Sequence, residues 1–164
     1  MSFEDEIIKQ ANSISKQIID MKECIIESLG YNPFESFEES IRSDYREINK
    51  YLETAMFHIL KFYFSTNDDP KYQWLKTIER SLENFRDGIS INNKLNRNIL
   101  KMLEKTFLNT YLESYKDYQQ SAKIYTDLLY NIDNIPIKCP WTLEDFLYKD
   151  IDELLEILGD VNNG

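Results

Sequence analysis

The chain has 164 residues, room for one domain over 1–164, and a formal net charge of −10 that disfavours binding of nucleic acid by the whole molecule. Apolar residues make up 42% of it, enough for one core, whereas 4 glycines and 4 prolines argue against turn-rich sandwiches and barrels. The absence of a long apolar run, of a signal-peptide pattern and of a disulfide framework predicts a cytoplasmic helical protein without a membrane span.

The first expected helix covers residues 4–29 and carries apolar residues at alternating spacings of four and three. This stripe consists of Ile7, Ala11, Ile14, Ile18, Met21 and Ile25, and a second apolar line beside it holds Ile8, Ile19 and Ile26. Two adjacent lines give more apolar surface than one neighbouring helix covers. We therefore expect one line to pack on the chain's own bundle and the other to meet a partner, such as a second copy. Burial of the whole helix within its own bundle is the competing interpretation.

The remaining periodicities predict three more long helices and two short C-terminal ones. Their expected positions are 32–65 with a bend near 40–43, 70–87 ended by Gly88, 92–130 begun by Asn92 or Asn93, a short helix capped by Thr142, and a last helix ending at Gly159. The expected fold is therefore all-α, a bundle of four main helices with short C-terminal helices.

Charge is spread unevenly along the chain. Residues 71–110 have a net charge of 8 − 4 = +4, whereas residues 131–164 have 2 − 8 = −6. Four cations at helical spacings form one basic stripe, which holds Lys94, Arg97, Lys101 and Lys105. Such a stripe suits a phosphate-rich partner, so a regulator linked to nucleic acid is one alternative function. A solvated helix face is the simpler interpretation.

Four blocks stand out in this order along the chain. They are Asn32-Pro33-Phe34-Glu35-Ser36-Phe37-Glu38-Glu39, His58-Ile59-Leu60-Lys61-Phe62, Trp74-Leu75-Lys76-Thr77-Ile78-Glu79-Arg80 and Pro136-Ile137-Lys138-Cys139-Pro140-Trp141-Thr142-Leu143-Glu144. Together they resemble a bacterial helical family, the domain-of-unknown-function family number 29. The resemblance covers residues 32–147, with the helix of 1–31 and the tail of 148–164 outside it. It implies an all-helical fold and a bacterial source, and it implies no reaction.

The residues singled out as candidates for binding come from these blocks and from the tyrosine-rich fourth helix. They are Glu35, Glu38, His58, Lys61, Trp74, Arg80 and Tyr118. Four tyrosines of one stripe, Tyr111, Tyr115, Tyr118 and Tyr125, suit either a partner interface or the edge of the core.

The sequence gives less support for a catalytic or metal-binding function. His58 is the only histidine, and a hydrolase would need it beside Glu38 or Cys139. A ferritin-like metal site is excluded because no Glu lies three residues before His58. Carboxylates at the start of the second helix leave a magnesium site open, but a solvated acidic helix end explains them as well. Cys139 suits a small apolar filler of the core.

These considerations predict a protein–protein interaction or adaptor-like module, with no cofactor and no metal. The expected partner is a protein, including a second copy through the first helix, while nucleic acid is disfavoured and a membrane is not expected. A hydrolase using His58 and a nucleic-acid-linked regulator using the basic stripe remain as alternatives.

Overall fold

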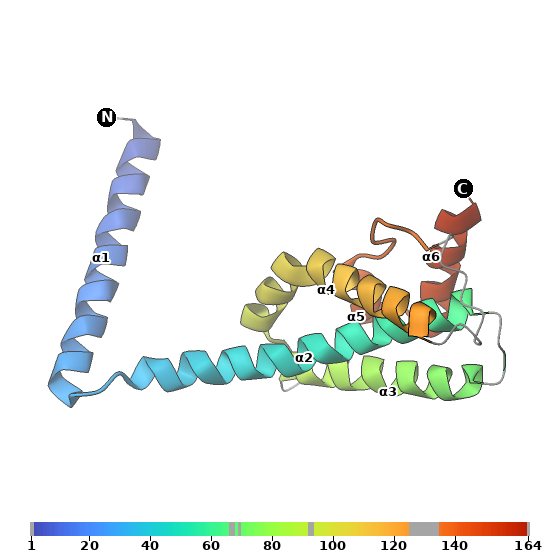
Figure 1. Cartoon of the computed structure of the whole chain (residues 1–164). Coiled ribbons are helices and arrows are strands. Elements are labelled where there is room, and N and C mark those ends of the chain that lie inside the picture. Colours follow the sequence, from blue (N-terminus) through green and yellow to red (C-terminus); the bar gives the residue numbers. More distant parts are fainter. Residues whose placement is uncertain (1, 66–67, 69, 92–93, 125–134, 164) are drawn as a thin grey trace. The chain divides into compact units, whose positions relative to one another are not determined.

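The structure is a computed structural model that describes residues 2–65, 68, 70–91, 94–124 and 135–163. It divides into two compact units, Met1–Ser40 and Ile41–Gly164, and the boundary falls inside a helix. The elements are α1 (Phe3–Leu29), α2 (Pro33–Phe64), α3 (Lys71–Ile89), β1 (Ser90–Ile91), β2 (Lys94–Leu95), α4 (Arg97–Ile124), α5 (Leu143–Tyr148) and α6 (Ile151–Asn163) (Figure 1). The predicted all-α bundle with short C-terminal helices is confirmed. A single domain over 1–164 stays a prediction.

In the first unit, α1 has a capping motif at each end. At its start, the Ser2 hydroxyl accepts from the Asp5 backbone N–H and the Asp5 carboxylate accepts from the Ser2 N–H, which makes a capping box. At its end, Gly30 takes the left-handed conformation (φ 72°) and donates its N–H to the Ile26 carbonyl. The predicted bounds of 4–29 therefore hold to within one residue. No residue of α1 is buried.

In the second unit, α2, α3 and α4 lie side by side (Figure 1). Two hydrogen bonds set α2 and α4 parallel and in register. The Tyr45 hydroxyl donates to Thr106 Oγ1 at 2.6 Å, and Thr110 Oγ1 donates to the Asn49 side chain at 2.9 Å. One turn of α2 thus matches one turn of α4 along the pair.

Most of the expected apolar stripes of α2, α3 and α4 form the core of this unit. Its fully buried large side chains include Leu52, Met56, Ile59, Ile78, Phe85, Ile99, Leu103, Tyr111 and Tyr118. Within each helix, successive members of this set are three, four, seven or eight positions apart, because a helix that packs on one side repeats its apolar residues with a period near 3.6. The expected Tyr125 lies outside the described residues.

Between α3 and α4 the structure differs from the sequence prediction. The prediction that Gly88 ends α3 was wrong, since α3 runs through it to Ile89. A side chain at Gly88 would lie only 2.7 Å from Ile48 Cγ1, so the glycine allows α2 to approach closely. A short antiparallel ladder of β1 and β2 follows α3, so α4 begins only at Arg97.

The cap of α4 is Asn96, not Asn92 or Asn93. Its side-chain oxygen accepts from the backbone N–H of Asn98 at 3.1 Å and of Ile99 at 3.4 Å. All three asparagines are suitable caps in sequence, and the ladder decides among them because it occupies the chain up to Leu95.

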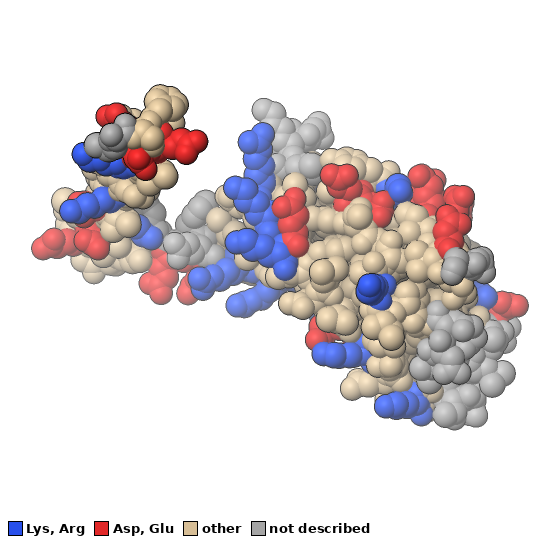
Figure 2. All heavy atoms as spheres, turned by 90° about the horizontal axis from the view of Figure 1, so that it is seen from above, with Lys and Arg blue, Asp and Glu red and all other residues tan. Residues whose placement is uncertain are grey.

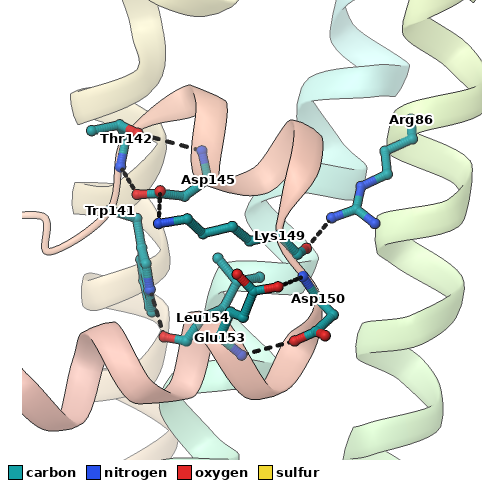
Figure 3. Close-up of polar contacts among 8 residues, drawn as sticks. All are labelled: Arg86, Trp141, Thr142, Asp145, Lys149, Asp150, Glu153 and Leu154. Atoms are coloured by element: carbon teal, nitrogen blue, oxygen red, sulfur yellow. Dashed lines mark hydrogen bonds and ion pairs between the residues drawn. The ribbon is translucent and has the colours of Figure 1, made fainter.

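Both C-terminal helices are capped, α5 by Thr142 as predicted and α6 by Asp150 (Figure 3). The Asp145 carboxylate accepts from the Thr142 N–H at 2.7 Å, completing a capping box for α5. The Asp150 carboxylate accepts from the Glu153 N–H at 2.9 Å at the start of α6. However, α6 continues past Gly159 to Asn163, so the predicted end of that helix was wrong.

No helix in the described part of the chain combines the length and apolarity needed to cross a bilayer.

Candidate functional site

His58 lies half-buried on the side of α2 that faces α4. Its Nδ1 lies 2.9 Å from the Thr54 carbonyl oxygen, an acceptor, so Nδ1 carries the proton and donates it. The ring packs edge-on against Phe57, with the ring centroids 5.1 Å apart. Burial lowers the pKa of His58, which favours the neutral imidazole.

Lys61, one turn further along α2, is held by aromatic rings. Its Nζ lies 5.1 Å from the centroid of Phe57 and 4.6 Å from that of Trp74 on α3. Burial lowers the pKa of this ammonium, and the faces of the rings supply the attraction that a carboxylate would otherwise supply. Trp74 is only 7% exposed, so the contact joins α2 to the core side of α3.

Arg80 does not join this cluster. It is exposed and lines a groove of about 500 Å³ between α2 and α3, together with Tyr51 and Thr54. His58 lines a different groove, of about 460 Å³, between α2 and α4. The candidate residues His58 and Arg80 therefore line two different grooves along α2.

A carboxyl pair that the sequence did not reveal lies in the α2–α4 groove. Glu53 of α2 and Asp117 of α4 both line it. Burial raises the pKa of Glu53, and hydrogen bonding and repulsion from Asp117 raise it further. The two residues are 64 positions apart in sequence, and only the parallel register of α2 and α4 brings them together.

Arg86 is a second residue that sequence reasoning missed. Its Nε donates to the Phe146 carbonyl at 2.9 Å, and a second guanidinium nitrogen donates to the Lys149 carbonyl. These acceptors lie at the end of α5, where helix carbonyls lack partners within the helix, so one side chain of α3 binds the end of α5. Figure 3 shows the contact of Arg86 with Lys149. Nothing in the local sequence separates Arg86 from an ordinary surface arginine.

Cys139 and Tyr118 both lie inward. Burial raises the pKa of Cys139 to about 11, and its thiol contacts the Trp141 carbonyl at 3.4 Å. A thiol of this kind is a poor nucleophile at neutral pH. Tyr118 is 0% exposed, so it forms part of the core rather than of a surface.

The two acidic candidates lie in the first unit. Glu35 is exposed in the first turn of α2, and the side chain of Glu38 lies outside the described residues. Among the residues that the structure describes, no group of three metal-ligating side chains is close enough to hold an ion.

The predicted basic stripe is exposed where it is described. Arg97, Lys101 and Lys105 lie along the surface of α4, while the side chain of Lys94 lies outside the described residues. The Tyr45–Thr106 hydrogen bond brings the exposed Arg42 and Arg46 of α2 to the level of Lys105. Figure 2 shows Lys and Arg side chains gathering where α4 begins.

The largest set of exposed apolar side chains lies on α1. Within the first unit, Ile7, Ile14 and Ile18 are 50%, 57% and 61% exposed. Met21 and Ile25 continue the same stripe at 64% and 40%. The second line is less regular, because Ile8 and Ile19 are exposed and Ile26 is partly covered.

A family model described as "Domain of unknown function DUF29" matches residues 14–151. The chain belongs to the DUF29 family. No curated protein and no solved structure matches it.

The DUF29 match extends beyond the four blocks, which span residues 32–147. It begins at Ile14, inside α1, and ends at Ile151, the first residue of α6. The C-terminal half of the exposed stripe on α1 therefore belongs to the DUF29 region, as do His58, Lys61 and Trp74.

Proposed function

We propose that this DUF29 chain is a protein–protein interaction or adaptor-like module, in which α1 is the element that binds the partner and the second unit is its folded support. The observation that carries the proposal is the stripe on α1. It runs through three heptads, and no residue of the helix is buried within its own unit.

The energetics of the stripe support a partner. Fully burying one exposed Ile side chain is worth about 1.5–3 kcal/mol, and the cost of association offsets part of that gain. Ile7, Ile14, Ile18 and Ile25 are each 40–61% exposed, so a partner that covers all four gains a share of this free energy from each of them. Contiguous exposed apolar surface of this kind typically marks an interaction site.

The caps of α1 support the same role. The Ser2–Asp5 capping box and the Gly30 C-cap fix both ends, so the helix has its own signals for starting and stopping. Such a helix presents its side chains to a partner at defined spacings, which a disordered segment would do only after folding.

A hydrolase receives less support from the second unit. Catalytic histidines are usually oriented by a carboxylate that accepts from Nδ1. His58 instead donates to the carbonyl of Thr54 in its own helix. The raised pKa of Cys139 and its inward position also make it a poor partner for His58.

We place this role in the bacterial cytoplasm, and the free thiols of Cys24 and Cys139 are the support for a reducing compartment.

Photo-crosslinking in the cell that produces the protein tests the proposed function. A photoreactive phenylalanine derivative replaces Ile18 in one variant and Lys16, on the opposite face of α1, in the other. We expect covalent adducts with another polypeptide chain from position 18 and few from position 16, with the crosslinked peptide identified by mass spectrometry. A lack of intermolecular adducts at position 18 would contradict the proposal.

A further inference from the structure

We propose that the partner of α1 is the α1 helix of a second copy, packed antiparallel so that Ile14 of one chain meets Ile18 of the other. This inference rests on the proposed function and names its partner.

The spacing of the stripe is that of a two-helix coiled coil. From Ile7 to Ile25 the intervals are four, three, four, three and four residues, which are the a and d positions of successive heptads. An interface of this kind needs a second helix with the same repeat over the same length. Another copy of α1 provides one.

The second unit offers no comparable surface among its described residues. Its exposed large apolar side chains are scattered over several elements and are Tyr72, Leu108, Leu112, Ile124, Ile137, Tyr148 and Val161. Leu108 and Leu112 share a face of α4, but they cover one turn only. Three heptads of α1 span about 30 Å at 1.5 Å per residue, so one turn of leucines does not match them.

The size of the side chains favours the antiparallel arrangement. An antiparallel pair centred on Lys16 places Ile7 opposite Ile25, Ala11 opposite Met21 and Ile14 opposite Ile18. The smallest residue of the stripe then shares a layer with the longest, and every other layer holds two isoleucines. A parallel pair would instead stack Ala11 on Ala11, which leaves a gap, and Met21 on Met21.

Charge favours the same arrangement. The first turn of α1 carries Glu4, Asp5 and Glu6, and its last turn carries no basic residue. A parallel pair would bring the two acidic first turns together, and like charges at short range repel. In the antiparallel pair each acidic first turn lies instead beside a last turn with one acidic residue, Glu27, so the repulsion is weaker. The two-fold symmetry makes the interface closed, so assembly ends at a dimer.

Sedimentation equilibrium of the full chain tests for the dimer. We expect a mass of twice 19.6 kDa at high concentration, and a monomer for the Ile14→Asp/Ile18→Asp variant. The matched control, Asn12→Asp/Ser13→Asp, adds the same charge away from the stripe and should remain dimeric. A full chain that is monomeric at every concentration overturns this inference, whereas crosslinks from position 18 to a different protein would leave the proposed function standing.

Disulfide trapping tests the orientation. Ile14→Cys and Ile18→Cys chains, both carrying Cys24→Ser and one of them labelled with ¹⁵N, are mixed and oxidised. The antiparallel pair predicts disulfides mainly between a labelled and an unlabelled chain. Equal or faster crosslinking of Ile18→Cys chains with one another indicates a parallel pair and overturns the inference.

Discussion

Lys61 Nζ lies 4.6 Å from the centroid of the Trp74 ring and so joins α2 to α3 through a cation–π contact. The two residues belong to different sequence blocks that resemble the DUF29 family. Their contact gives a structural role to one residue of each block. The ring supplies an attraction that compensates the partly buried ammonium, which lies over the tryptophan ring.

Replacing Trp74 by Ala should lower the free energy of unfolding by about 3–5 kcal/mol, the usual loss when a buried aromatic is removed. The side chain is 7% exposed, so the change leaves a cavity and removes the ring below Lys61. Urea unfolding followed by circular dichroism measures the loss, and Trp74→Phe should recover most of it. A loss below about 1 kcal/mol would be inconsistent with a core position.

Glu53 should make stability depend on pH. Its pKa in the folded chain is raised above its ordinary value of 4.5, so folding favours the protonated form. The stability that this proton contributes is present below that ordinary value and is lost as pH rises through the raised pKa. Glu53→Gln should therefore increase the melting temperature at pH 7, with the gain disappearing near pH 4. The control Glu104→Gln, on an exposed residue of α4, should show no such trend.

Removing the Arg86 side chain should loosen the C-terminal helices. Arg86→Ala leaves the carbonyls of Phe146 and Lys149 without this donor, at a cost of about 1.5–3 kcal/mol for a charged hydrogen bond. Hydrogen exchange of the amides in α5 and α6 measures the effect, and we expect faster exchange there than in α2. Arg80→Ala, on the exposed part of the same helix, serves as control and should change neither.

The two thiols should react at different rates. Cys24 is exposed, whereas the pKa of Cys139 is raised from 9.0 to about 11, which reduces its thiolate fraction roughly 100-fold. A chromogenic thiol reagent at pH 8 should modify one cysteine quickly in the native chain and two after denaturation without reductant. Equal native rates would contradict the inward position of Cys139.

Local patterns were enough to predict most of the helices. The apolar periodicity of α2, α3 and α4, the bounds of α1 and the Thr142 cap depend on residues within one or two turns of one another, so they can be recognised in the sequence alone. Gly88 and Asn96 show where local reasoning fails. A glycine that ends an isolated helix is kept inside α3 because α2 needs the space, and the choice among three capping asparagines depends on the β1–β2 ladder.

The contacts between helices could not be predicted in this way. Glu53 meets Asp117, and Arg86 binds the end of α5, only because the second unit fixes the register of elements far apart in sequence. The division of His58 and Arg80 between two grooves has the same origin, since both sides of α2 are occupied by different helices. Such contacts can be identified only once the packing of the helices against one another is known.

Unfolding of the Ile14→Asp/Ile18→Asp full chain, followed by tryptophan fluorescence, tests whether the stripe on α1 serves a partner chain or the core of its own chain. Both tryptophans, Trp74 and Trp141, belong to the second unit, so their emission reports the stability of that unit alone. If the stripe on α1 serves a partner chain, the urea midpoint of the variant equals that of the wild-type chain. A clearly lower midpoint, or an insoluble variant, would mean that the stripe completes the core of its own chain, and it would contradict a partner-binding role for α1.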